Sequence, residues 1–224
     1  MRRTVIAVVD TETTGVDPKK DRVIEAAWAL VDVPTAEVVE IGSRLFRSET
    51  NEAEAVNGIP AELVQIAEPG PELVNFASHP LACDIEAFVA HNADFDRQWD
   101  VFAPLSIPWL DTRDWRWPKS SSDATLVQLA LAHGIGVTSA HRAYTDVLIL
   151  AALLRRVHET VPLSAQLEYA RLPRHTYEAF VSFEKKDLAK QAGFRWEPDR
   201  KRWTRRMLPE DAAKLPFKTR ILAA

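Results

Sequence analysis

The chain has 224 residues, of which 46% are hydrophobic and 27% are charged, which is typical of a soluble globular protein with a sizeable core. Its single cysteine, Cys83, excludes an intramolecular disulfide, and the lack of a long apolar run argues against a membrane span. The net charge is −4, yet residues 171–224 hold 14 Lys and Arg against 7 Asp and Glu, a balance of +7. We therefore expect a cytoplasmic protein without a membrane partner, in which the basic C-terminal region has an electrostatic role.

Several segments have the apolar, β-branched composition of strands. Residues 4–10, TVIAVVD, form a continuous run that is typical of a fully buried strand. Residues 22–33 and 37–47 follow, with only Pro-Thr-Ala between them, which predicts a hairpin. Further strands are expected near 85–90 and within 107–114.

Helical patterns occur between and after these strands. Residues 51–77 have a helical pattern broken by prolines, and 93–102 have helical spacing. Asp123 is expected to cap a helix over 124–134, and 143–161 is the longest helix candidate. Strands that come first, followed by helices alternating with strands, predict an α/β fold with a mixed sheet covered by helices.

The composition changes near residue 162. We expect a main domain over residues 1–161, a linker over 162–180 and a small basic unit over 181–224. Within the last unit, FRW and RWTR flank a turn-like stretch, so Trp196 and Trp203 are expected on neighbouring strands of a hairpin.

The hairpin of this small unit mixes aromatic and basic residues. Trp196, Trp203, Lys201 and Arg202 suit single-stranded nucleic acid, whose bases stack on rings and whose phosphates pair with cations. A different interpretation is that the tryptophans form the unit's own core and the charges form a solvated face. Both interpretations stay open on the sequence alone.

Two carboxylates end the first predicted strand, in the stretch DTETTG. Residues i and i+2 of a strand point to the same face, so Asp10 and Glu12 project together. Carboxylates this close repel each other unless a proton or a cation lies between them. Ligand sets made only of oxygen favour hard cations such as Mg²⁺ or Mn²⁺. The stretch predicts half of a metal site, although a polar turn that closes a strand has the same composition.

Two further polar clusters lie at the start of later helices. In AHNADFDRQW, His91 and Asn92 precede a helical segment that contains Asp96. In HRAYTDVLILAALL, His141 precedes an apolar helix that contains Asp146 near its start. A lone histidine or aspartate in such a place is more often a structural residue, but three clusters in order favour a common site.

These three stretches resemble the three sequence motifs of the DEDDh (DnaQ-like) 3′→5′ exonucleases, a superfamily that includes the proofreading subunit of bacterial DNA polymerase III, ribonuclease T, oligoribonuclease and exonuclease X. The resemblance covers about residues 4–156, and the second and third motifs are most similar to those of exonuclease X. It implies a ribonuclease H-like fold, with a five-stranded mixed sheet flanked by helices. It also implies two Mg²⁺ or Mn²⁺ ions per active site.

The resemblance also assigns roles to single residues. Asp10 corresponds to the residue that bridges both metals. Glu12 and Asp146 correspond to ligands of the metal nearer the attacking water, and Asp96 supports the second metal. His141 corresponds to the histidine that takes a proton from that water.

Four more residues correspond to parts of the family's substrate site. Thr13 is expected at the terminal nucleotide, and His91 and Asn92 near a phosphate. Asn57, in AVNGIP, stands where the family often has a histidine and is the candidate for a second contact to that nucleotide, although the residue type departs from the family pattern.

The function implied is a metal-dependent 3′→5′ exonuclease that releases nucleoside 5′-monophosphates from single-stranded or 3′-terminal DNA, in repair or in proofreading with a polymerase or repair partner. One alternative is a 3′→5′ exoribonuclease that acts on RNA or short oligonucleotides, because the motifs do not read the 2′-OH. Another is a non-catalytic nucleic-acid-binding module. The sequence gives no indication of oligomeric state.

Overall fold

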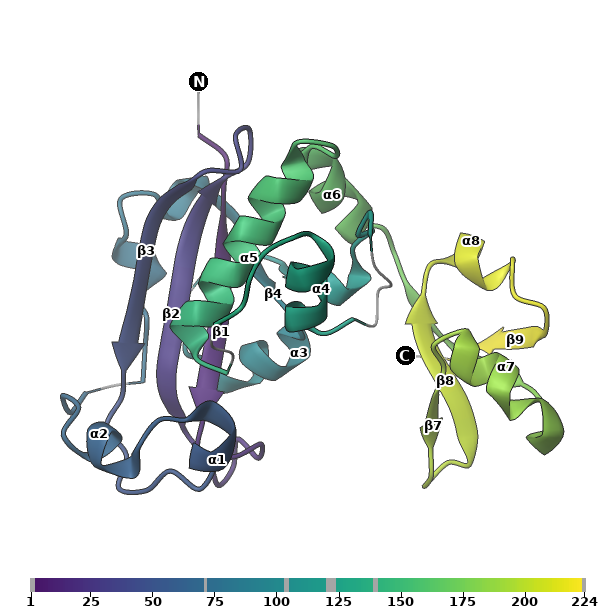
Figure 1. Cartoon of the computed structure of the whole chain (residues 1–224), viewed down its shortest axis with the longest axis horizontal. Helices are drawn as coiled ribbons and strands as arrows, with labels where there is room; N and C mark the ends of the chain where they lie inside the picture. Colours follow the sequence, from purple (N-terminus) through teal and green to yellow (C-terminus); the bar gives the residue numbers. More distant parts are fainter. Residues whose placement is uncertain (1–2, 71, 103–104, 120–123, 139–140, 223–224) are drawn as a thin grey trace. The chain divides into compact units, whose positions relative to one another are not determined.

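The computed structural model describes residues 3–70, 72–102, 105–119, 124–138 and 141–222. It divides into two compact units, one that ends at Ala170 and one that begins at Arg171. Figure 1 labels their elements. The strands of the first unit are β1 (Val5–Thr13), β2 (Val23–Asp32), β3 (Val38–Leu45), β4 (Ile85–Ala90) and β5 (Trp109–Asp111). Its helices are α1 (Glu54–Asn57), α2 (Ala61–Gln65), α3 (Ala93–Asp96), α4 (Leu126–Ala132), α5 (Ala143–His158) and α6 (Leu163–Ala170), with 3₁₀ turns η1 (Phe76–Ser78), η2 (Ala82–Asp84), η3 (Arg97–Trp99) and η4 (Thr112–Asp114).

The first unit is built on a five-stranded sheet with the order β3-β2-β1-β4-β5. β1 pairs antiparallel with β2 and parallel with β4, so it is the central strand. This position agrees with its continuous apolar sequence, since a strand covered on both faces has no solvent side. The expected hairpin is present as β2 and β3, and the mixed sheet predicted from the sequence is confirmed.

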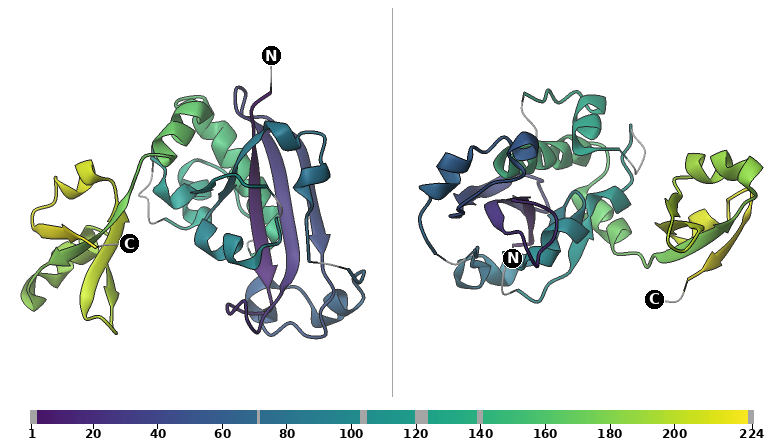
Figure 2. Two further views of the ribbon diagram at one scale, coloured as in Figure 1. Left: turned by 180° about the vertical axis from the view of Figure 1, so that it is seen from behind. Right: turned by 90° about the horizontal axis from the view of Figure 1, so that it is seen from below.

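Helix α5 lies across β1, β2 and β3 on one face of the sheet (Figures 1 and 2). Its buried side chains Val147 and Leu150 belong to the same core cluster as Ile6 and Val8 of β1. Because strand side chains alternate, the residues that continue this face beyond Val8 lie toward the N-terminal end of α5. That continuation places the carboxyl end of β1 under the first turn of the longest helix.

A second core cluster covers the opposite face of the sheet. Val5, Ala7 and Val9 of β1 pack there with aromatic side chains such as Phe76 and Phe88. The short helix α3 follows β4 on this side, and its Ala93 is part of the same cluster. β1 therefore presents one set of residues to α5 and the alternate set toward α3.

Helix α4 begins at a capping box rather than at the expected cap. The Thr125 hydroxyl accepts a hydrogen bond from the Gln128 N–H at 3.2 Å, and the Gln128 side chain accepts one from the Thr125 N–H at 2.9 Å. Two otherwise unpaired N–H groups are satisfied this way. Asp123, the expected cap, lies outside the described residues.

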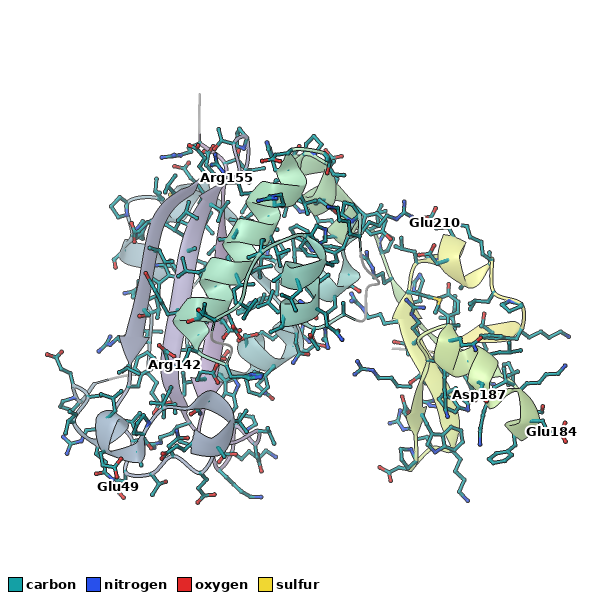
Figure 3. All side chains as sticks on the ribbon, viewed as in Figure 1. Glu49, Arg142, Arg155, Glu184, Asp187 and Glu210 are labelled. Carbon is teal, nitrogen blue, oxygen red and sulfur yellow. The ribbon has the colours of Figure 1, made fainter. Side chains whose placement is uncertain are left out.

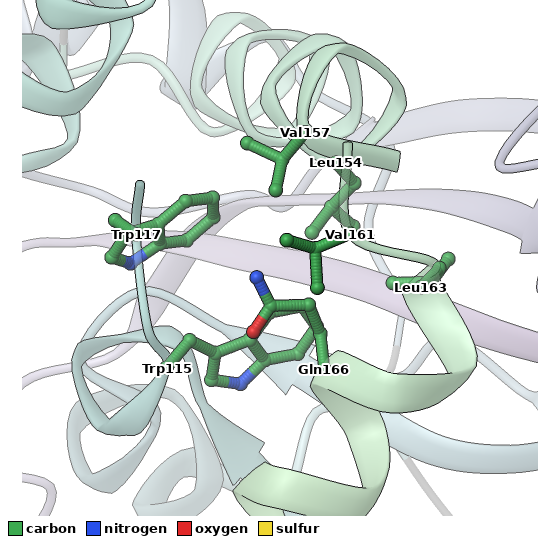
Figure 4. A pocket seen from close by; sticks show the side chains of 7 residues that line it. All are labelled: Trp115, Trp117, Leu154, Val157, Val161, Leu163 and Gln166. Atoms are coloured by element: carbon green, nitrogen blue, oxygen red, sulfur yellow. The ribbon is translucent and has the colours of Figure 1, made fainter. Parts of the chain in front are cut away.

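Helix α6 closes the first unit and lies within the segment that was expected to be a linker. Figure 4 shows the small apolar pocket where it meets α5 and the segment after β5. Leu163 is buried there, and the Gln166 amide donates to the Arg116 carbonyl at 2.9 Å beside the stacked rings of Trp115 and Trp117. The structure therefore assigns 163–170 to the core of the first unit, because its apolar residues face the sheet.

The second unit begins earlier than the sequence indicates. Residues 175–180, also expected in the linker, form a strand that pairs on both sides in a sheet of order β7-β8-β6-β9. Tyr177 and Ala179 of that strand are buried in this unit's own core. The elements are β6 (His175–Phe180), η5 (Phe183–Lys185), α7 (Lys186–Gln191), β7 (Arg195–Glu197), β8 (Arg202–Met207), α8 (Pro209–Ala212) and β9 (Lys218–Ile221).

Among the residues that the structure describes, none of the helices is long and apolar enough to cross a membrane.

Candidate metal centre

Three carboxylates meet where β1 ends beneath α5. Asp10 and Glu12 lie on the face of β1 that α5 covers, and Asp146 lies in the first turn of α5. One ligand atom from each of the three residues lies within 4.8 Å of the others. Asp146 Oδ1 is buried and has no hydrogen-bond partner among the described residues. An all-oxygen donor set with an unsatisfied buried oxygen fits a hard divalent cation.

Asp96 approaches the same place from the other side of the sheet. Its residue is only 3% exposed, and its Oδ1 accepts a hydrogen bond from the Thr11 hydroxyl at 2.8 Å. Thr11 stands between Asp10 and Glu12 in β1 and therefore points to the opposite face. Asp96 lies outside the group of three, but it is the neighbouring charge that raises the pKa of Asp10 most.

The carboxylates of this cluster hold their protons unusually well. Burial, followed by the charges of Asp96 and Glu12, raises the pKa of Asp10 well above its ordinary value. Burial and then the charge of Asp146 raise the pKa of Glu12 from 4.5 to about 8. Burial raises the pKa of Asp96 to about 7, although the bond from Thr11 opposes the shift. Without a counter-charge the cluster retains protons near neutral pH, and a bound cation would replace them.

His141 stands beside this cluster, in the loop before α5. The residue is exposed and has a φ of 62°, in the left-handed region that few non-glycine residues occupy. A hydrogen bond from its backbone and the charge of its ring both lower the pKa of Asp146, against the larger effect of burial. The histidine therefore adjoins a carboxylate of the cluster and also faces solvent.

A buried ion pair fixes the start of α5. Glu25 of β2 is 2% exposed and accepts two bonds from the Arg142 guanidinium, at 3.0 and 3.1 Å, and one from the Ala143 N–H at 3.1 Å. Glu25 is the direct cross-strand partner of Glu12. Figure 3 labels Arg142 at the N-terminal end of α5, near the end of β1 and the start of β2. The pair ties the helix that carries Asp146, and the loop that carries His141, to the sheet.

The supporting residues Glu25 and Thr11 were not among the candidates from the sequence. A glutamate in the apolar stretch RVIEAAWALVDV is the signal that could have identified Glu25, since a charged residue inside a buried strand needs a partner. Thr11 offers no such signal, because threonine is common in strands.

Thr13 and Asn57 lie together at the end of β1, and both are buried. The Asn57 amide nitrogen donates to the Thr13 carbonyl at 3.1 Å, and its oxygen accepts from the Asn51 amide at 2.9 Å. Asn57 is only 2% exposed, so its side chain supports the backbone of Thr13 from behind. Asn57 thus supports the backbone of Thr13, and its contact to the terminal nucleotide stays a prediction.

His91 and Asn92 follow β4 and are held by β5 and the turn after it. His91 Nδ1 lies 2.9 Å from the Thr112 hydroxyl, and the Asn92 N–H donates to Asp111 Oδ1 at 3.1 Å. Burial lowers the pKa of His91, so its ring stays neutral at neutral pH. Both residues occupy the carboxyl edge of the sheet, where α/β folds place their ligands.

The four appendage residues lie in the second unit. The rings of Trp196 and Trp203 are 5.4 Å apart, and Trp203 packs against that unit's core while Trp196 is about half exposed. Lys201 lies in the turn between β7 and β8, and Arg202 donates to Glu197 at 2.9 Å. The tryptophans therefore combine a packing role with partial exposure.

Several solved structures that resemble this chain are exonucleases. Exonuclease X, in complex with duplex DNA that has a 5′ overhang, matches 74% of this chain and 99% of its own with a TM-score of 0.53 and 24% identity. Exonuclease I of E. coli, in complex with a dT13 oligonucleotide, matches 96% of this chain and 68% of its own with a TM-score of 0.60 and 14% identity. The fold is that of these exonucleases. The resemblance predicted from the sequence and the ribonuclease H-like sheet are thus confirmed at the level of the fold.

Two sequence comparisons add to this picture. The PolC-type DNA polymerase III of Thermotoga petrophila is 28% identical over 170 residues, which cover 68% of this chain. The chain spans only 12% of the length of that polymerase. Residues 175–222 match a family described as a domain of unknown function, DUF8626, and these residues form nearly all of the second unit.

Proposed function

We propose that this protein is a metal-dependent exonuclease of the DEDDh class, which hydrolyses DNA from its 3′ end and releases nucleoside 5′-monophosphates. The observation that carries the proposal is the meeting of Asp10, Glu12 and Asp146 within 4.8 Å, with Asp96 beside them. The DNA-bound exonucleases of the same fold and the polymerase relative support DNA as the substrate.

The residues of the cluster would hold two divalent cations, Mg²⁺ or Mn²⁺. Asp10, Glu12 and Asp146 bring their carboxylate oxygens together, and Asp96 lies close enough for its charge to raise the pKa of Asp10. When bound, such cations stabilise the negative charge on the attacking and leaving oxygens of phosphodiester hydrolysis. Burial, and after it the mutual repulsion of the carboxylates, raises the pKa values of Asp10 and Glu12, and a bound cation would relieve that repulsion.

His141 is proposed as the general base. It adjoins Asp146 and is exposed, so its ring can accept a proton from a water molecule that attacks a bound phosphate. An imidazole accepts protons readily near neutral pH. The Glu25–Arg142 pair holds the adjacent backbone, which limits the positions that the ring can take.

The substrate end is proposed to lie at the carboxyl edge of the sheet. Thr13 would contact the terminal nucleotide through its backbone, which Asn57 supports, and His91 and Asn92 would lie near a phosphate. Single-stranded or 3′-terminal DNA is the proposed substrate at this edge, and the proposed role is in repair, or in proofreading beside a polymerase or repair partner.

The test measures the degradation of a DNA oligonucleotide labelled at its 5′ or its 3′ end, in the presence of Mg²⁺, Mn²⁺ or a chelator. We expect the 5′-labelled strand to shorten in single-nucleotide steps and the 3′-labelled strand to release a labelled mononucleotide first. Chelation should stop both reactions. Cleavage that continues in chelator, or that starts inside the strand, would contradict the proposal.

Two aspartates of α3 offer a matched pair of variants. Asp96→Asn should abolish hydrolysis, whereas Asp94→Asn, which changes an exposed carboxylate two residues away, should not. RNA and duplex DNA of the same sequence are the further substrates. If the protein hydrolyses RNA and not DNA, the result favours an exoribonuclease. If it binds DNA but hydrolyses neither substrate, the result favours a non-catalytic binding module.

A further inference from the structure

The sheet of the second unit has one covered face and one open face. Tyr177 and Ala179 of β6 pack in the core with Ala189 of α7 and Ala212 of α8. Both helices therefore lie on the same side of the sheet, as Figures 1 and 2 show. Alternate residues of each strand point the other way. We define the open face by Thr176, Glu178 and Phe180 of β6 and Arg202, Thr204 and Arg206 of β8.

An aromatic ring lies at one end of this open face with cations on both sides. Phe180 is 52% exposed and pairs directly with Lys218 of β9. The register of β6 with β8 places Arg202 on its other side, one residue beyond the pair Ala179–Trp203. The Arg220 guanidinium carbon lies 5.5 Å from the centroid of the Phe180 ring. A single exposed apolar side chain needs no explanation, but a ring within such a row of cations is a distinct chemical feature.

The charge of the open face is positive. Acidic residues of the same face pair with some of its cations, as Arg202 does with Glu197 at 2.9 Å and Arg220 with Glu178 at 2.6 Å. The basic side chains that the described strands place on this face are Arg195, Arg202, Arg206, Lys218 and Arg220, against the acidic Glu178 and Glu197. The face thus has an excess of positive charge around an accessible ring.

We propose that this open face binds single-stranded nucleic acid, with an unpaired base stacked on Phe180 and phosphates beside Lys218 and Arg220. Stacking requires a base whose faces are exposed, which excludes a paired base inside a duplex. The phosphates supply the negative charge that the face lacks. This surface differs from the one expected from the sequence, because the Trp196 and Trp203 rings contact each other and Trp203 packs on the covered side.

The test measures binding of the full chain to a fluorescent oligothymidylate in chelator, where hydrolysis does not occur. Phe180→Ala should weaken binding about 10-fold, the size of effect that loss of one stacked base produces. An abasic oligomer with the same phosphates should bind the wild type more weakly than oligothymidylate does. The Phe180→Ala variant should bind the two oligomers almost equally.

Phe183 offers a matched control. It is 81% exposed, and the Lys186 ammonium lies 4.0 Å from its ring centroid, so it has the same chemistry as Phe180 with Arg220. It lies in η5, directly before α7, and α7 packs on the covered side of the sheet through Ala189. Phe183→Ala should leave the affinity unchanged. Equal losses in the two phenylalanine variants, or no loss in Phe180→Ala, would overturn the proposal.

A charge experiment separates nucleic acid from an acidic protein segment. Lys218→Glu with Arg220→Glu should lower the dependence of affinity on salt, whereas Lys185→Glu with Lys186→Glu, the same change beside α7, should not. If polyglutamate of equal charge displaces oligothymidylate as well as unlabelled DNA does, the face binds anions in general and the proposal fails. Because binding is measured without hydrolysis, failure here leaves the exonuclease proposal intact.

Discussion

Glu25 has three of its hydrogen-bond acceptor positions occupied by the start of a single helix. Its carboxylate accepts hydrogen bonds from Nε and Nη2 of Arg142 and from the Ala143 N–H. These bonds fix the position and the orientation of the first turn of α5. Asp146 follows three residues after Ala143, and His141 comes just before Arg142. The geometry of both candidate site residues therefore depends on a side chain that lies outside the group of three carboxylates.

We expect Glu25→Gln to lower kcat about 10- to 100-fold with little change in KM, because a small displacement of positioned groups slows the chemical step strongly. The free energy of unfolding should also fall by about 1–3 kcal/mol, since Arg142 loses its charged partner. Steady-state kinetics on a labelled oligonucleotide and urea unfolding measure the two effects.

Asp32 provides the control for this variant on the same strand. It forms an ion pair with Arg3 at 2.9 Å and accepts a bond from Thr35, at the end of β2 away from the site. Asp32→Asn should destabilise the fold and leave kcat unchanged. If both variants lose activity in proportion to their loss of stability, Glu25 has only a structural role.

His141→Ala should reduce turnover about 100-fold or more, the usual cost of removing a general base. Because the residue is exposed, the melting temperature should not change, and the increase in melting temperature caused by Mg²⁺ should persist. Thermal denaturation with and without Mg²⁺ and single-turnover hydrolysis provide both readings. Near-normal turnover would remove the histidine from the mechanism.

At the scale of elements, the titration of Glu12 at the end of β1 makes the free energy of unfolding depend on pH. The pKa of Glu12 rises from 4.5 to about 8 on folding, so the folded state binds this proton more tightly than the unfolded chain does. The contribution of this proton to the free energy of unfolding is fully present below about pH 4.5, and it is lost as the pH rises through about 8. In chelator, we expect the free energy of unfolding to decrease across this range.

Glu12→Gln should flatten that decrease, because the amide does not titrate. Urea unfolding at a series of pH values measures the slope for each protein. Glu62→Gln, which changes an exposed carboxylate of α2, is the control and should retain the wild-type slope. Identical slopes for the wild type and Glu12→Gln would mean that the carboxylate is not protonated in the folded state.

The elements that sequence alone identifies are those with a local pattern. β1 was predictable because its apolar run stops at two carboxylates, and α5 because one helical face stays apolar over four turns. The Thr11–Asp96 bond joins residues 85 apart in the chain, and the Glu25–Arg142 pair joins residues 117 apart. No local pattern encodes such pairings, which depend on how the sheet and helices come together.

The position of the boundary between the two units also depends on packing and not on a local pattern. The segment 162–180 contains Pro162 and Pro173 and looks like a connection, yet Leu163 and Tyr177 are buried in two different cores. A short helix and a short strand give too few periods for a sequence pattern to show which side is buried. Only the residues that pack against this helix and this strand show to which unit each of them belongs.

For the whole molecule, the presence of two separate cores predicts two unfolding transitions. The candidate metal ligands all lie in the first unit, so saturating Mg²⁺ should raise the transition temperature of that unit by several degrees. Cation at about 100 times its Kd adds about 2.7 kcal/mol to the stability of the state that binds it. Differential scanning calorimetry measures both transitions, and Asp10→Asn should abolish the shift. A Mg²⁺ shift of both transitions would contradict this assignment.

The central position of β1 also determines where the chain tolerates insertions and deletions. One extra residue before Asp10 would turn both carboxylates to the face of Thr11, because strand side chains alternate. Two extra residues would restore the face but carry the carboxylates about 7 Å along the strand, away from the first turn of α5. Residues 14–22 connect β1 to β2 outside the strands, so changes of length there leave Asp10 and Glu12 in place. Natural variation in length is therefore expected in that connection and not within β1.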